Sequence, residues 1–422
     1  MPSAFQGEEK IMKLSVIICV YNTDKTYLTE CLSSIFSSTL SDYEVVFVDD
    51  GSTVDYSDLL EKYKVKYSKT ENGGHFAARL HGIEISEGEY ITFVDSDDTV
   101  SKNYHQPMVD AADKHGADIV INSWAFHTER TKRCCLYELS HKEKVFVEGG
   151  EVLPFFTSCR GRDHSYSVQW NKIYRKSTVL SAIAELSGTE IFKKRLTYAE
   201  DTLLSFFFFK HAGRVTSVNS GFYLYRIHSS QSVTAGNEEK LKTHIDCMCG
   251  VLNTMLAAIP SGENAKKMTE DISYWKGLMA RTHYSISRSC GYSSLYPYIK
   301  EKYGVEKLSL STLHDAKLYS KSELLGENFD DIDSALVSLF ENDGNVTASY
   351  DRSSTYIPRI ISSLSELYEK KIDYAKKNAD VVIPKPKSRL TDSIIHNSFV
   401  YRVGMLLFPK GSKIRSFLKK HL

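Results

Sequence analysis

Residues 90–98 read YITFVDSDD, and the rest of the chain is organised around this stretch. A hydrophobic strand from Tyr90 to Val94 runs directly into Asp95, Asp97 and Asp98, which are three carboxylates within four positions. Carboxylates this close repel one another, and an Asp-x-Asp pair at a strand end can hold one hard divalent cation through its oxygens. Such a cation keeps waters and bridges to substrate phosphates. The pattern predicts a site for a phosphate-bearing ligand, with a solvated Asp-rich turn as the alternative.

The residues before this stretch alternate between apolar strands and amphipathic helices. Apolar runs at 14–20 and 43–48, and a shorter run at 65–68, are typical of buried parallel strands. The spacing of apolar residues predicts helices at 27–36, 56–63 and 76–85. This alternation predicts an α/β domain with a mostly parallel sheet and helices on both faces.

Each predicted strand ends in a polar cluster. The carboxyl ends of parallel strands share one edge of the sheet, and ligands bind at that edge. We therefore expect one common site, although each cluster alone is also what a helix cap or a turn requires. Neither the Gly-x-Gly-x-x-Gly of dinucleotide-binding domains nor a phosphate loop is present. The clusters are Tyr21-Asn22, Asp49-Asp50-Gly51-Ser52, Asn72-Gly73-Gly74 and Asp95-Ser96-Asp97.

The composition sets wider bounds on domains and partners. A length of 422 residues suggests two or three domains. Lys plus Arg and Asp plus Glu each total 53, so no global field points to a nucleic-acid partner. The eight cysteines form no Cys-x-x-Cys pair and predict free thiols in a reducing cytoplasm. The first ten residues lack the apolar core of a signal peptide, and no apolar run approaches the ~20 residues that span a bilayer.

The ordered set of motifs resembles the family-2 glycosyltransferases of the GT-A fold over about residues 13–235. No single motif is specific, but their order is. Where the family commonly carries Ala-Arg-Asn, this chain has Ala78-Arg79-Leu80-His81, which keeps the arginine and removes an amide. The motifs that carry the resemblance are Ser15-Val16-Ile17-Ile18 with Tyr21-Asn22, Val48-Asp49-Asp50-Gly51-Ser52, Asn72-x-Gly74 with Ala78-Arg79, Gly88-x-Tyr90, and residues 93–98.

The resemblance implies a nucleotide-sugar donor, most often a UDP-sugar, held with Mn²⁺ or Mg²⁺. It implies that Asp50 lies at the uracil edge, that Tyr21 stacks near the base, and that Arg79 lies close to the uracil or the pyrophosphate. Asp95 and Asp97 would hold the ribose and the metal, with His228 as a further metal ligand or phosphate donor. The full donor-binding set expected is Val20, Tyr21, Asn22, Asp49, Asp50, Ser52, Asn72, Gly74, Arg79, Asp95, Ser96, Asp97, Arg226 and Ser232.

Two later segments carry the expected chemistry of transfer. Glu200-Asp201 begins an apolar helix, and acids favour a helix N-terminus through the macrodipole alone. The resemblance implies instead that this is the catalytic pair, with Asp201 as the general base of an inverting transfer. It also places Trp170 and Asn171 on the acceptor side of the cleft, although a Trp packed under a loop fits the sequence as well.

Strand signals fade after residue 236, and helical spacing predicts a second domain. The expected organisation is a tail at 1–12, a GT-A domain at 13–236, a helical domain at 237–383, and a linker with a basic amphipathic segment at 384–422. Apolar residues beside a basic tail suit contact with an anionic membrane surface, while a helix docked on its own protein is the alternative. The expected partners are a glycan or lipid-linked acceptor and a second copy of the chain.

The resemblance also implies a place in bacterial polysaccharide synthesis, of capsule or lipopolysaccharide type, at the inner face of the cell membrane. Two other functions remain open. Asp95 with Asp97 and Thr99 matches the start of haloacid-dehalogenase-like phosphatases, where Asp95 would be the nucleophile. The chain could also be a non-catalytic module that binds a nucleotide-sugar.

Overall fold

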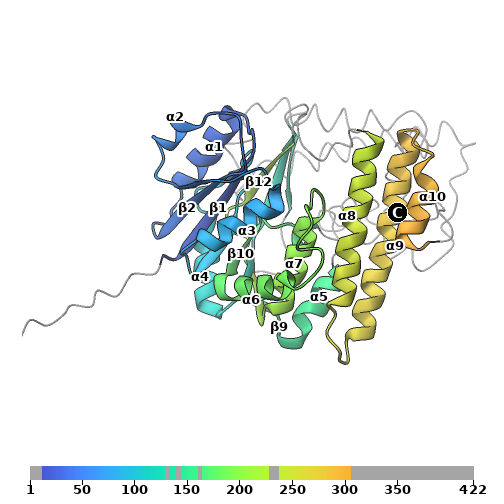
Figure 1. Ribbon diagram of the computed structural model, residues 1–422. Helices are drawn as coiled ribbons and strands as arrows, with labels where there is room; N and C mark the ends of the chain where they lie inside the picture. The colour runs from blue at the N-terminus through green and yellow to red at the C-terminus, as the bar shows by residue number, and fades with distance from the viewer. Residues whose placement is uncertain (1–11, 129–132, 138–143, 160–163, 228–236, 306–422) are drawn as a thin grey trace, which may run out of the picture. The chain divides into compact units, whose positions relative to one another are not determined.

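The computed structural model describes residues 12–305, apart from 129–132, 138–143, 160–163 and 228–236 (Figure 1). The described residues all belong to one compact unit. The predictions for residues 306–422, which include the linker and the basic segment, lie outside the described residues.

A central sheet runs through this unit in the order β3-β2-β1-β4-β10-β6-β11-β9. The first four of these are all parallel, as the alternating sequence predicts. β10 interrupts the series because it runs antiparallel to both of its neighbours. The strands are β1 (Leu14–Val20), β2 (Tyr43–Asp49), β3 (Lys66–Lys69), β4 (Tyr90–Phe93), β6 (Ile119–Ile121), β9 (Lys144–Glu148), β10 (Lys172–Arg175) and β11 (Arg214–Ser217).

Helices cover both faces of the sheet, which confirms the predicted fold class. Side chains alternate along β1, so that Ile17 and Cys19 face one core while Val16 and Ile18 face the other. The face of Val16 is covered by α1 (Lys25–Phe36), α2 (Ser57–Leu60) and α4 (His105–His115). The face of Ile17 is covered by α3 (His75–Ile85), α5 (Val152–Cys159), α6 (Lys176–Ser187) and α7 (Glu200–His211), with short 3₁₀ turns at η1 (Gly149–Glu151) and η2 (His164–Tyr166).

A second, smaller sheet begins where the Asp-rich loop ends. It has the order β5-β12-β7-β8, built from β5 (Thr99–Val100), β12 (Tyr223–Ile227), β7 (Trp124–Thr128) and β8 (Arg133–Tyr137). β7 and β8 pair antiparallel. β5 follows Asp98 directly and pairs with β12, so this sheet fixes the far end of the Asp-rich loop.

Three helices follow the last strand: α8 (Glu238–Ala257), α9 (Ala265–Ser289) and α10 (Leu295–Tyr303). They match the helical region expected from residue 237. α8 packs against α7, and α9 packs against α5 (Figure 1). Their apolar side chains share one core with the sheet, including the completely buried run from Phe206 to Phe209. No helix in the described part of the chain is both long and apolar enough to cross a bilayer.

Candidate active site

The loop after β1 is held against the loop after β2. Asn22 adopts a positive φ of 51°, and its Oδ1 accepts from the amides of Thr53 at 2.9 Å and Val54 at 3.3 Å. The Asn22 amide donates to Ser52 Oγ at 3.0 Å, and Ser52 Oγ donates to the carbonyl of Val20 at 3.4 Å. Asn22, Ser52 and Val20 therefore shape the edge of the sheet. The neighbouring Tyr21 is 55% exposed and leaves a ring face available to a ligand.

Asp50 fastens the loop at 72–74 to the same edge. Its Oδ1 accepts from the Gly73 amide at 2.7 Å, and its Oδ2 accepts from the Gly74 amide at 2.9 Å. Asn72 Nδ2 donates to the Asp50 carbonyl at 3.0 Å. Gly74 has a φ of 85°, a conformation that glycine adopts without steric cost. Asp50 is only 4% exposed, so in this structure its carboxylate orients the start of α3.

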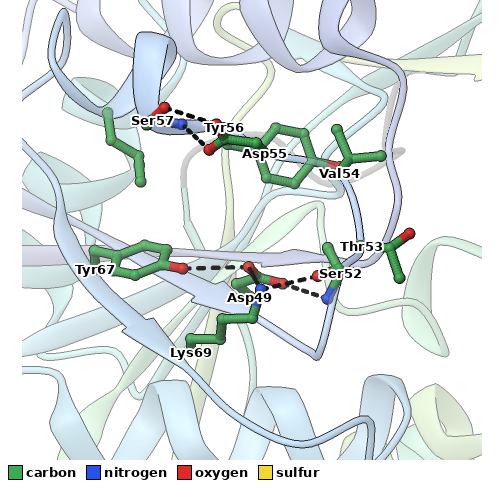
Figure 2. Close-up of a pocket in the computed structure, with 10 residues that line it drawn as sticks. Asp49, Ser52, Thr53, Val54, Asp55, Tyr56, Ser57, Tyr67 and Lys69 are labelled. Atoms are coloured by element: carbon green, nitrogen blue, oxygen red, sulfur yellow. Dashed lines mark hydrogen bonds and ion pairs between the residues drawn. The ribbon is translucent and has the colours of Figure 1, made fainter.

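Asp49 lines a cavity of about 350 Å³ between β2, β3 and the loop at 52–57 (Figure 2). Its carboxylate accepts from the Ser52 amide at 2.7 Å and from Tyr67 Oη at 3.2 Å, and Lys69 Nζ lies 3.1 Å away. Burial alone would raise the pKa of Asp49, but the Ser52 amide and the Lys69 ammonium hold it below its usual value. The cavity lining does not include Asp95, Glu200, Asp201 or Arg79.

The Asp-rich loop presents alternate residues to the open site. Asp95 and Asp97 are partly exposed, whereas Ser96 is 9% exposed and Asp98 is fully buried. Ser96 Oγ lies 2.7 Å from Thr23 Oγ1, which ties the loop to the end of β1. Asp98 accepts from Tyr223 Oη and from the Arg226 amide, both at 2.7 Å. These bonds fix the backbone around Asp97 while Asp95 and Asp97 stay partly exposed.

Arg226 lies between the Asp-rich loop and α1. Its Nε donates to the Asp97 carbonyl at 2.8 Å, and its Nη2 pairs with Glu30. The guanidinium carbon lies 4.6 Å from the centre of the Tyr27 ring. Arg226 is thus part of the support of Asp97. The other two residues expected in this segment, His228 and Ser232, lie outside the described residues.

Arg79 joins three carboxylates from distant parts of the chain. Its side chain is only 2% exposed, and it lies on the buried face of α3. Nη2 is 3.3 Å from Asp95 Oδ1, Nη1 is 3.3 Å from Glu200 Oε1, and Nη1 also pairs directly with Asp201 Oδ1. The resemblance implies that Arg79 lies close to the uracil or the pyrophosphate. The structure instead holds its guanidinium among these carboxylates, a position that only its place on an otherwise apolar helix face could have suggested.

Glu200 and Asp201, the two acids at the start of α7, have pKa values that are shifted in opposite directions. Partial burial raises the pKa of Asp201 to about 6, although Arg79 opposes this. Burial acts on Glu200 in the same direction, but the hydrogen bond to His75 and the charge of Arg79 lower its pKa to about 2. Glu200 Oε1 is 3.7 Å from His75 Nδ1. Asp201 keeps 30% of its side chain exposed, compared with 13% for Glu200, so Asp201 is the more accessible of the two.

Two further contacts, absent from the sequence-based set, hold the first turn of α7. Gln169 is fully buried, and its Nε2 donates to the Asp201 carbonyl at 2.9 Å and to Ser205 Oγ at 2.7 Å. Tyr198, just before the turn, stacks on His244 of α8 with ring centroids 4.4 Å apart. Neither residue stands in a motif, because each acts through a partner far away in the sequence.

Trp170 and Asn171 are buried beneath the site. Trp170 is 3% exposed and stacks on Tyr223 with ring centroids 4.5 Å apart. Asn171 is fully buried, and its Oδ1 accepts from Lys172 Nζ at 2.6 Å. The buried Lys172 ammonium also donates to the carbonyls of Ser165 and Val168, both at 2.5 Å. As the structure stands, these side chains have almost no surface for an acceptor, and Trp170 occupies the packed position that the sequence left open as the alternative.

The carboxylates of the Asp-rich loop suit a hard divalent cation that takes only some of its ligands from the protein. Asp95 and Asp97 supply two partly exposed carboxylates, and oxygen ligands of this kind suit Mg²⁺ or Mn²⁺. Among the described residues, no group of three or more His, Cys, Asp or Glu side chains could hold a metal by itself. An ion at this point would need further ligands from water and from a bound diphosphate, as Mg²⁺ commonly does.

Comparison with known proteins agrees with this geometry. The family model described as Glycosyl transferase family 2 matches residues 15–168. EpsH of Bacillus subtilis (strain 168), named as a glycosyltransferase, is 31% identical over 225 residues, which are 52% of this chain and 62% of EpsH. The poly(ribitol-phosphate) beta-N-acetylglucosaminyltransferase TarS of Staphylococcus aureus (strain Mu50) is 30% identical over 224 residues, which are 51% of this chain and 35% of TarS.

Solved structures of S. aureus TarS share the fold. Residues 1–349 of TarS align with a TM-score of 0.50 at 21% identity, covering 81% of this chain and 93% of that one. The same part of TarS in complex with UDP-GlcNAc aligns with a TM-score of 0.52 at 18% identity, covering 85% and 92%. The family model that matches is that of glycosyl transferase family 2, which favours the glycosyltransferase interpretation over a phosphatase with a nucleophilic Asp95.

Proposed function

The chain belongs to glycosyl transferase family 2 through its GT-A domain, and on this premise we propose that it transfers a sugar from a UDP-sugar to a hydroxyl group of a glycan or lipid-linked acceptor, with inversion. The observation that carries the proposal is the position of Arg79, which gathers Asp95, Glu200 and Asp201 at the carboxyl edge of the sheet. In α/β sheets this edge is where ligands bind.

Asp201 is the proposed general base. It takes the proton of the acceptor hydroxyl while the acceptor oxygen forms a bond to the anomeric carbon of the sugar. The bond from that carbon to the diphosphate breaks, and the nucleoside diphosphate leaves with the electron pair. A pKa of about 6 keeps Asp201 mostly ionised at neutral pH yet basic enough to accept a proton. Glu200, whose pKa is near 2, stays ionised and holds Arg79 and His75 in place.

Asp95 and Asp97 would hold Mn²⁺ or Mg²⁺. When bound, such an ion supplies positive charge that stabilises the leaving diphosphate. Asp98 and Arg226 keep the two ligands facing the site through the bonds described above. The exposed ring of Tyr21 is the proposed stacking surface for the base. Asp50 and Asn72 order the loop at 72–74 beside this edge of the sheet, and Asp49 accepts from the amide of Ser52 in the loop after β2.

The acceptor is proposed only by class. The relatives named above include an enzyme that glycosylates poly(ribitol-phosphate), a cell-wall polymer, which supports a role in bacterial polysaccharide synthesis. We keep as proposals the inner-face location, the contact of residues 394–422 with anionic membrane, and self-association. Residues 394–422 lie outside the described part of the chain.

The test of the proposed function begins with UDP binding, measured by calorimetry with and without Mn²⁺. UDP-sugars are then screened for UDP release, starting with UDP-GlcNAc because TarS was solved with that donor. Mn²⁺-dependent binding together with release from one sugar supports the proposal. Binding without turnover of any donor would favour a nucleotide-sugar binding module, and no binding at all would reject a UDP-linked donor.

A further inference from the structure

The residue just before α7 has a strained backbone. Ala199 is the N-cap of α7 and has a φ of 65°, in the left-handed region that residues with a side chain seldom adopt. It supplies no side-chain hydrogen bond to the first turn. Strain of this kind persists only where the surroundings fix it, and it gathers at functional sites. Two anchors flank Ala199, one on each side in the sequence.

The anchor after Ala199 is the pair of carboxylates bound to Arg79. Glu200 and Asp201 are consecutive on a helix, where neighbouring side chains point about 100° apart. Both nevertheless reach Nη1 of the same arginine. Both carboxylates can reach Arg79 only because the first turn of α7 leaves Ala199 in a particular direction. The turn therefore sets the position of the proposed base.

The anchor before Ala199 is Tyr198, whose ring is held by α8 and α9. It stacks on His244 with ring centroids 4.4 Å apart and ring planes 12° apart. The ring of His283 lies 6.2 Å away, and His283 Nδ1 is 2.7 Å from Tyr303 Oη of α10. His244 is 7% exposed and His283 is 1% exposed, so both rings are fixed by the helices around them.

The two histidines act as flat neutral rings at neutral pH. Burial lowers the pKa of His283 to about 3, and burial also lowers the pKa of His244, with Lys240 acting in the same direction. His244 and His283 therefore add no positive charge beside Glu200. The stack of Tyr198 on His244 depends on where the two rings lie, so a phenyl ring can replace the imidazole of His244.

We propose that His244 is a positioning residue for the proposed transfer reaction: its stack on Tyr198 fixes the turn at Ala199 and so holds Asp201 beside Arg79. The inference rests on the proposed function, because Asp201 matters as a base only if the chain is a transferase. It gives the helices after residue 237 a direct part in the active site. The link is the sequence of contacts from α8 through Tyr198 and Ala199 to the acidic pair.

The test compares His244→Ala with His244→Phe and with the control Tyr284→Ala. Tyr284 and Tyr296 form another ring contact, with centroids 4.8 Å apart, between α9 and α10, and it involves neither α7 nor Tyr198. We expect His244→Ala to lower kcat about tenfold or more while the donor KM and the Kd for UDP change less than about twofold. His244→Phe should recover kcat to within about threefold of the wild type. Tyr284→Ala should lower Tm but not kcat.

Ala199→Gly is the second variant, because it separates strain from packing. Glycine accepts the positive φ, so Tm should not fall, yet the looser turn should lower kcat about threefold or more.

A wild-type kcat in His244→Ala, or an equal kcat loss in Tyr284→Ala, would overturn the inference. If the wild type turns over no donor, the proposed function fails. The positioning is then judged by crystal structures of the wild type and His244→Ala, where Asp201 should separate from Arg79, and an unchanged ion pair would reject it.

Discussion

Arg79 and Asp201 form a direct ion pair although 122 positions separate them in the sequence. The guanidinium of Arg79 also lies against Asp95 and Glu200, so one positive charge faces three carboxylates. The cluster is negative unless a proton or a cation joins it. Burial is the main cause of the raised pKa of Asp201, and the charges of Glu200 and Asp95 act in the same direction. The excess of negative charge also suits the neighbouring Asp95 and Asp97 to a divalent cation.

Asp201→Asn should lower the rate of transfer about 10²–10⁴-fold and leave donor binding intact. A general base contributes about 10²–10⁴-fold to the rate, and the amide cannot accept the proton. UDP release measured with saturating donor and acceptor gives the rate, and calorimetry gives the affinity for UDP. A collapse of UDP affinity in this variant would mean that Asp201 supports the site instead of taking the proton.

The rate of transfer should depend on the protonation of Asp201. Because its pKa is raised to about 6, the carboxylate is protonated and inactive below that pH and ionised above it. The rate constant kcat should therefore rise with pH, with a midpoint near 6, and level off toward neutrality. The residual activity of Asp201→Asn serves as the control and should show no such rise. The same acid limb in that variant would assign the titration to another group.

Arg79→Met should destabilise the fold strongly. Removing one partner of a buried ion pair leaves uncompensated charge and costs about 3–5 kcal/mol. Lys25→Met is the matched control, because Lys25 and its partner Asp58 are 45% and 54% exposed, and such surface pairs contribute about 0–1 kcal/mol. Urea unfolding followed by circular dichroism measures both. Equal losses of unfolding free energy in the two variants would contradict the central role of Arg79.

Asp97→Asn should remove the effect of Mn²⁺ on donor binding. The loss of one carboxylate ligand should weaken UDP binding in the presence of Mn²⁺ about tenfold or more, and change it little without the ion. Asp55→Asn is the control, since Asp55 lines the separate cavity and its carboxylate bonds to Ser57. Calorimetric titrations with UDP, with and without Mn²⁺, measure the effect of the ion on both variants. An undiminished Mn²⁺ effect in Asp97→Asn would reject Asp97 as a metal ligand.

Deletion of residues 394–422 should release the chain from anionic lipid. Each basic residue near an anionic surface adds about 1 kcal/mol of attraction, and this segment carries several beside apolar residues. Sedimentation with phosphatidylserine-containing vesicles measures the bound fraction, and vesicles of neutral lipid are the control. The membrane proposal is abandoned if the shortened chain sediments as before.

The sequence by itself determined the strands at the centre of the domain, their parallel order and the polar clusters at their ends. These follow from local patterns, because a buried parallel strand needs a continuous apolar run and the carboxyl ends of such strands share an edge. The run at 14–20 coincides with β1, and the clusters after β1, β2 and β4 meet through Asn22, Ser52 and Ser96.

Only the tertiary structure decided what the polar side chains contact. Asp50 looked available to a ligand, but its carboxylate binds two backbone amides, and Trp170 is packed in the core. The place of Arg79 among three carboxylates and the stack of Tyr198 on His244 depend on segments brought together by the packing of α3, α7 and α8. Such contacts and the pKa shifts that they cause depend on distances and burial in three dimensions, and no local pattern in the sequence encodes them.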